Sequence, residues 1–174
     1  MIHFQKRVES IVDNSAMSLT ASEVIKYVKL CIKTGALTGE PEVFFGEIKN
    51  HESMCGLKRD SSGKLETIFI FPKDKVEARI LKHEIGHGME FTEMVKNGRK
   101  HDRYFFRGSW MRRKTGQALG FEYRREKRAW IHSGISNKDP LVLAALTGYA
   151  LKATDSLFMF IVIASSVAML RGIF

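Results

Sequence analysis

The residues best suited to chemistry are His83, Glu84 and His87, which form the pattern H-E-x-x-H. Positions four apart on an α-helix lie on one face, about one turn apart, so both imidazoles can reach the same metal ion. Glu84 follows the first histidine, and its carboxylate can take a proton from a water bound to that ion. The motif therefore predicts a Zn²⁺ site with hydrolytic chemistry.

A helix is expected to carry this motif. Asp74 and Glu77 have the spacing of a capping box just after Pro72, and apolar residues follow at helical spacing. Gly86 and Gly88 oppose a helix, because each costs up to about 1 kcal/mol relative to alanine. Their missing side chains would instead allow a strand or a second helix to pack closely against this one.

The elements before the motif predict an α+β fold. Residues 3–13 are expected to form a short amphipathic helix. Thr20 with Glu23 forms a capping box for a second helix, which Gly35 would end. Three strands are then expected to form a small antiparallel meander that leads into the motif helix: Glu42–Ile48, Ser53–Lys58 and Leu65–Phe71. A strand beside the metal helix could bind a substrate peptide as an added strand.

A zinc ion held by two histidines needs a third protein ligand. Residues Phe121–Ser133 are expected to be helical, with Glu122 and Glu126 on one face. Either glutamate could be the ligand, or both could form ion pairs within this arginine-rich helix. Three other residues could then supply the ligand: His101, Asp102 and His132. The candidate donors to the oxyanion that develops during hydrolysis are Tyr123, Tyr104 and His132.

The chain has a net charge of +9, which favours acidic partners. Much of this charge lies in residues 96–128, where aromatic residues alternate with lysine and arginine. Single-stranded nucleic-acid grooves use this combination, but a solvated loop whose aromatics fold back on the core has the same composition. A lid over the substrate is a third interpretation. Cys31 and Cys55 lack a metal-site spacing, and no apolar leader opens the chain, so free thiols in a cytoplasmic protein are expected.

The C-terminal region predicts two helices, Leu141–Lys152 and Ser156–Leu170. The second is uncharged and apolar on every side, which requires a nonpolar environment around it. It is shorter than the roughly 20 residues of a spanning helix. Packing on the protein, an oligomer contact and membrane insertion are the alternatives for 156–170. The expected domains are thus 1–154, which carries the site, and an apolar C-terminal helix, 155–174.

Three sequence features together resemble the ImmA/IrrE-like metallopeptidases. These are a strand ending in Ile70-Phe71-Pro72, the H-E-x-x-H motif, and an E-x-x-A motif in Glu126-Lys127-Arg128-Ala129. The similarity covers roughly residues 40–150. Members of this family are minimal zincins, common in bacteria, phages and mobile elements, and are paired with helix-turn-helix repressors that they help remove.

The resemblance implies a role for each matching residue. His83 and His87 would hold Zn²⁺, Glu84 would be the general base, and Glu126 the third ligand, with Glu122 as the alternative. The expected function is a zinc-dependent metallopeptidase that hydrolyses a protein substrate, with a transcriptional repressor as the candidate by kinship. The alternative is a non-catalytic zincin-fold module that binds nucleic acid or a partner protein through residues 96–128.

Overall fold

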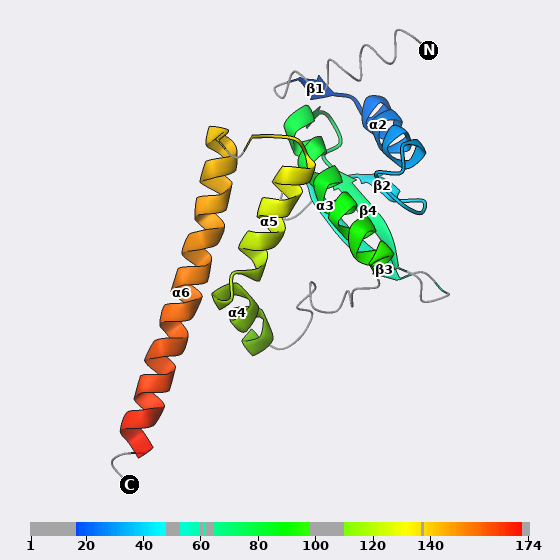
Figure 1. Ribbon diagram of the computed structural model, residues 1–174. Helices are drawn as coiled ribbons and strands as arrows, with labels where there is room; N and C mark the ends of the chain where they lie inside the picture. Colours follow the sequence, from blue (N-terminus) through cyan, green and yellow to red (C-terminus); the bar gives the residue numbers. More distant parts are fainter. Residues whose placement is uncertain are drawn as a thin grey trace. The chain divides into compact units, whose positions relative to one another are not determined.

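The computed structural model describes residues 17–47, 53–59, 61, 65–97, 110–136 and 138–171. Over these residues the fold is mixed α/β, with five helices and two small sheets (Figure 1). The helix expected over residues 3–13 lies outside them. The chain divides into two compact units, residues 1–98 with 129–135 and residues 99–128 with 136–174. The boundary passes through helix α5, whose last turn belongs to the first unit.

The first unit begins with α2, Ala21–Lys33. The Thr20 hydroxyl accepts a hydrogen bond from the Glu23 amide, and the Thr20 amide donates to the Glu23 carboxylate at 3.0 Å. The predicted capping box is therefore confirmed. Gly35 has φ +75°, just past the last turn, where a left-handed residue commonly ends a helix.

The sheet order is β2-β4-β3, formed by Glu42–Phe45, Leu65–Phe71 and Met54–Arg59. β3 and β4 are antiparallel, but β2 and β4 are parallel, so the expectation of a purely antiparallel meander is wrong. Each connection reverses the chain, so the first and third strands run in the same direction. β4 occupies the centre because its Phe69 and Phe71 are fully buried, which places the two parallel strands side by side.

The helix that carries the motif is α3, Ala78–Lys96, and its start differs from the prediction. Glu77 is the N-cap residue and makes no side-chain capping bond, so the expected Asp74–Glu77 capping box is wrong. Val76–Glu77 form strand β5, which pairs with β1, Ser18–Leu19. This short ladder holds the chain extended up to Glu77. The Ala78 amide then donates to the Met17 carbonyl at 2.8 Å, so a backbone acceptor satisfies this amide of the first turn.

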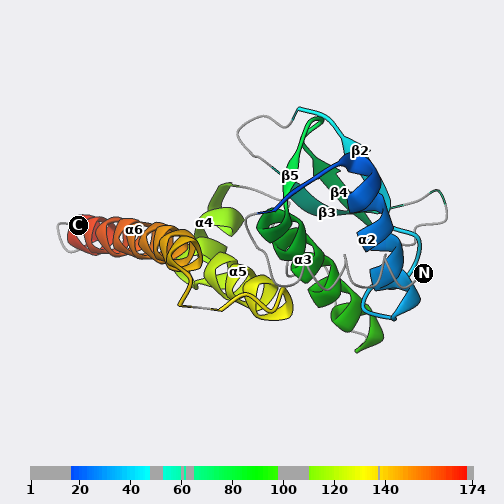
Figure 2. The same ribbon diagram turned by 90° about the horizontal axis from the view of Figure 1, so that it is seen from above.

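α3 packs against β3 and β4, as Figure 2 shows from above. Leu81 and Ile85 join Phe69 and Phe71 in the core of the first unit. A Cβ added at Gly88 would stand 2.7 Å from the Phe69 ring and 2.8 Å from Leu37. Gly88 therefore allows α3 to approach the sheet closely, as its sequence position predicted.

The second unit contains α4, Trp110–Ala118, the first turns of α5, Phe121–His132, and α6, Pro140–Arg171. α4 was not expected, because residues 96–128 were interpreted as a loop or lid. Its sequence is basic, includes Gly116, and lacks a clear apolar face. Packing against α6 stabilises it, and Ser156 and Gln117 form a hydrogen bond of 3.2 Å.

α6 is one helix of 32 residues, so the predicted interruption before Ser156 is wrong (Figure 1). No glycine or proline lies between Lys152 and Ser156, and threonine and aspartate reduce helix propensity only modestly. Thr154 donates its hydroxyl proton to the Ala150 carbonyl at 3.1 Å, a bond that helices accommodate. The expected domain boundary at 154/155 thus falls inside α6. Pro140–Met169 is long and apolar enough to cross a membrane by length and composition.

Candidate metal centre

α3 presents His83, Glu84 and His87 over one turn of helix. The rings of His83 and His87 lie 4.7 Å apart between centroids and are nearly perpendicular. His87 and Glu84 are each only 6% exposed. These two side chains are therefore shielded from bulk water and His83 is half-buried, which strengthens any electrostatic interaction made there.

The last turn of α5 is fixed on α3 by two contacts. The Ala129 carbonyl occupies the space that a Cβ at Gly86 would need, so Gly86 allows the two helices to touch through their backbones. Trp130 stacks on His83, with ring centroids 4.0 Å apart and an interplanar angle of 29°. These contacts limit both the position of the last turn of α5 and the orientation of the His83 ring.

Glu126 lies one turn before Ala129 on the same helix. His83, His87 and Glu126 each offer a ligand atom, and these atoms all lie within 4.8 Å of one another. The cluster can hold a metal ion by its geometry. Glu122 does not belong to it, and its carboxylate instead accepts a hydrogen bond from Gln117 at 3.3 Å. Of the two candidate glutamates, the structure brings only Glu126 to the histidine pair.

Glu126 is 4% exposed and forms an ion pair with Arg125 at 3.1 Å. Burial alone would lower the pKa of Arg125, but the neighbouring Glu126 carboxylate, with Tyr149 and Glu122, outweighs it and raises the pKa. Arg125 therefore stays charged beside Glu126. A permanent cation here favours the ionised carboxylate, which is the form that binds a metal.

Ser53 was not predicted to have a role at the site. Its hydroxyl donates a 2.7 Å hydrogen bond to Oε1 of Glu84. Ser53 directly precedes β3 and is 31 positions from Glu84 in the chain, so only the packing of β3 against α3 brings the two together. The sequence contains no local signal for this contact.

The other candidates have different surroundings. His132 lies 3.7 Å from the Glu93 carboxylate and is not part of the ligand cluster. Tyr123 lies on α5 one turn before Glu126 and is half-buried, and its role as an oxyanion donor stays a prediction. His101, Asp102 and Tyr104 lie outside the described residues.

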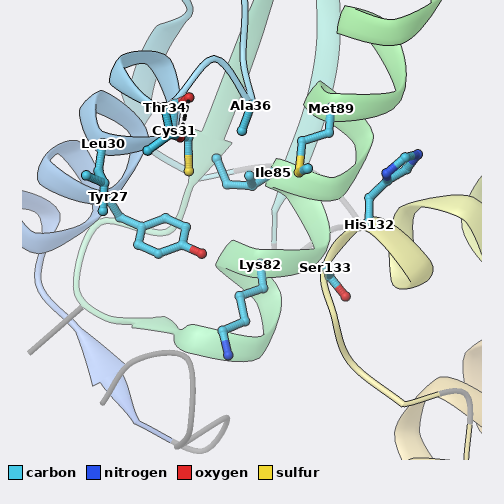
Figure 3. Close-up of a pocket in the computed structure, with 10 residues that line it drawn as sticks. All are labelled: Tyr27, Leu30, Cys31, Thr34, Ala36, Lys82, Ile85, Met89, His132 and Ser133. Carbon is cyan, nitrogen blue, oxygen red and sulfur yellow. Dashed lines mark hydrogen bonds between the residues drawn. The ribbon is translucent and has the colours of Figure 1, made fainter. Parts of the chain in front are cut away.

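A pocket of about 310 Å³ lies on another side of α3, between α2, α3 and the end of α5 (Figure 3). Its lining consists of Tyr27, Leu30, Cys31, Thr34, Ala36, Lys82, Ile85, Met89, His132 and Ser133. None of these is a member of the ligand cluster. Burial raises the pKa of the Cys31 thiol to about 11. Burial, with a contribution from Cys31, raises the pKa of Tyr27 to about 12. Both groups are therefore neutral at physiological pH.

Comparisons of the chain with models of known protein families, with curated proteins and with solved structures find no match.

Proposed function

We propose that this chain is a zinc-dependent metallopeptidase that hydrolyses a peptide bond in a protein substrate. The observation that supports the proposal most is the convergence of His83, His87 and Glu126, with Glu84 on the same turn as the histidines. Catalytic zinc is held by three protein ligands of this kind and keeps a further position open, whereas structural zinc is usually enclosed by four ligands.

The donor set fits zinc better than calcium or magnesium. Two imidazoles and one carboxylate suit zinc, while calcium and magnesium prefer oxygen ligands. The three ligand atoms lie within 4.8 Å of one another, near enough for one ion to be held by all three. Zinc bound there would polarise the substrate carbonyl and lower the pKa of a water molecule toward 7.

Glu84 would act as the general base and acid. Its carboxylate would accept a proton from the attacking water and then donate it to the nitrogen of the leaving amine. Its burial keeps competing bulk water away, and the Ser53 hydroxyl fixes one carboxylate oxygen at 2.7 Å. A carboxylate held in one orientation loses little entropy when it takes up the proton.

We further propose that the substrate binds along β3. This strand forms an edge of the sheet, and among the described residues its only strand neighbour is β4. An extended peptide could pair with the open side of β3 through backbone hydrogen bonds. Because Ser53 directly precedes β3 and contacts Glu84, a peptide in that position would pass beside the general base.

The kinship with ImmA/IrrE-like metallopeptidases is part of this proposal. It rests on H-E-x-x-H and E-x-x-A, whose His83, His87 and Glu126 converge in the fold. The proposal that the substrate is a helix-turn-helix repressor rests only on the resemblance to this family.

Hydrolysis of a repressor or of an unstructured protein such as casein tests the proposal, with zinc supplied. We expect cleavage that a chelator abolishes and that added zinc restores. Glu84→Gln should abolish cleavage while the protein still binds zinc, since glutamine keeps the shape but cannot accept the proton. Lys114→Gln, on α4, serves as a matched control and should leave cleavage unchanged. Full turnover by Glu84→Gln would remove Glu84 as the base.

The second candidate function is a binding module without catalysis. Arg124, Lys127 and Arg128 are exposed on α5 and offer positive charge to an acidic partner. Binding of single-stranded nucleic acid through such groups should weaken steeply as salt rises. Tight binding that is lost in Lys127→Gln/Arg128→Gln, together with zinc-loaded protein that cleaves nothing, would favour this function over hydrolysis.

A further inference from the structure

We propose that residues 153–170 of α6 insert into a lipid bilayer and anchor the protein to a membrane. The proposal does not depend on the peptidase activity. It begins from the exposure of α6, where every position from 161 to 169 is solvent-exposed. The large apolar residues exposed in this half of the helix are Leu157, Phe158, Ile161, Val162, Ile163, Val167 and Met169.

The protein covers only one stripe of α6. Val142, Leu146 and Ser156 are its buried residues, and their spacing of 4 and 10 positions places them on one side of the helix. α4 packs against α6, and the Gln117–Ser156 hydrogen bond lies in this region. Beyond Ser156 no described residue of α6 is buried.

The apolar residues beyond Ser156 surround the helix. Phe158, Ile161 and Val162 lie on one side of the helix, because they are 3 and 1 positions apart in sequence. Ile163 and Val167 lie on other sides of the helix. Docking onto one partner surface would cover one face and leave the others in water. A bilayer surrounds a helix on all sides, so it matches this distribution better.

Charged residues flank the segment at both ends, and an aromatic residue lies beside the first of them. Lys152 stacks its ammonium group 5.0 Å from the Tyr149 ring at one end, and Arg171 lies at the other. The 18 residues between Lys152 and Arg171 span roughly 27 Å at 1.5 Å per residue, close to the roughly 30 Å of a hydrocarbon core. Tyrosine, lysine and arginine are typical of membrane interfaces.

Asp155 is the only charged residue between these ends, and it lies three positions after Lys152. At this spacing it can pair with the lysine near the interface. All but one of the 28 lysine and arginine residues of the chain precede residue 153. Their positive charge complements an anionic membrane surface.

Flotation of the full-length protein with vesicles of phosphatidylcholine and phosphatidylglycerol tests the proposal. We expect the protein to float with the vesicles and to stay bound in alkaline carbonate and in about 1 M salt, which shortens the Debye length to about 3 Å and so screens surface charge. Phe158→Glu/Ile163→Glu should lower the bound fraction at least about tenfold, because both changes place charge at depth.

Leu143→Glu is the matched control. Leu143 is a similarly exposed apolar residue of the same helix, but it lies before Tyr149 and outside the proposed segment. This variant should float like the wild type, and circular dichroism should show equal helix content in all three proteins. Release of the wild type by salt alone would overturn insertion. A soluble dimer that Phe158→Glu/Ile163→Glu separates, without vesicle binding, would identify a second copy as the partner and also overturn it.

Discussion

The backbone carbonyl of Ala129 lies where the Cβ of any side chain at position 86 would stand. The last turn of α5 and the helix α3 are therefore in direct backbone contact at this point. One turn earlier on α5 is Glu126, the candidate third ligand, and one position later is Trp130, which stacks on His83. A single glycine thus permits the helix contact that supports the candidate metal site.

Gly86→Ala should therefore damage the site although alanine favours a helix by up to about 1 kcal/mol. The new methyl group meets backbone, which cannot rotate away, and overpacking of this kind costs about 1–3 kcal/mol. We expect zinc affinity, measured by competition with a chromophoric chelator, to fall at least about tenfold.

Gly148→Ala is the control for that change, because a Cβ at Gly148 in α6 meets nothing within 4 Å. It should leave zinc affinity unchanged and should not lower the thermal midpoint. Wild-type affinity in Gly86→Ala would show that α5 does not hold the third ligand in place through this contact.

Ser53→Ala should reduce hydrolysis and leave zinc content unchanged. The serine hydroxyl donates a 2.7 Å hydrogen bond to Glu84, the proposed base, and Ser53 is not a member of the ligand cluster. A hydrogen bond to a charged group contributes about 1.5–3 kcal/mol, so a loss of roughly tenfold or more in kcat is expected. Ser53→Thr keeps a hydroxyl and should retain most of the activity. Equal kcat for alanine and wild type would remove Ser53 from the mechanism.

The Cys31 thiol makes stability depend on alkaline pH. Burial raises its pKa from 9.0 to about 11, so between these values the folded chain binds a proton that the unfolded chain has lost. The contribution of the protonated thiol to the free energy of unfolding is fully present below pH 9. It declines as pH rises toward 11, by up to about 1.4 kcal/mol per pH unit. Denaturant titrations from pH 8 to pH 10.5 should show the decline.

Cys31→Ala isolates the thiol's share of this slope. Below pH 9 the variant should be less stable than the wild type, because it leaves a small cavity, but its stability should fall less steeply above pH 9. If stability falls with pH equally steeply in the variant and in the wild type, the thiol has the same pKa in the folded and unfolded states.

Local signals in the sequence predicted the features that depend on neighbouring residues. The Thr20 capping box and the close packing at Gly86 and Gly88 follow from residue type and spacing, and the structure confirms them. The convergence of His83 and His87 follows from helical geometry. The E-x-x-A motif predicted Glu126 as the third ligand, and the fold places Glu126 beside His83 and His87.

Features that depend on contacts between residues far apart in the sequence were not predicted. β2 lies beside β4 because Phe69 and Phe71 take the centre of the sheet, which no local pattern specifies. The Asp74–Glu77 cap failed because β1 holds the chain extended there. The Ser53–Glu84 hydrogen bond joins residues that are 31 positions apart in the sequence. Helix α4 is stabilised by its packing against α6, which is also distant in the sequence.

The metal content of the purified full-length chain tests the central claim most directly. Elemental analysis should find about one zinc per wild-type chain, as expected for a single His/His/Glu site. Glu126→Gln should lose the ion or bind it at least roughly tenfold more weakly, while Glu122→Gln should retain it. Folded wild-type protein that takes up no zinc when the ion is supplied, or zinc that is lost in Glu122→Gln and kept in Glu126→Gln, would contradict a site formed by His83, His87 and Glu126.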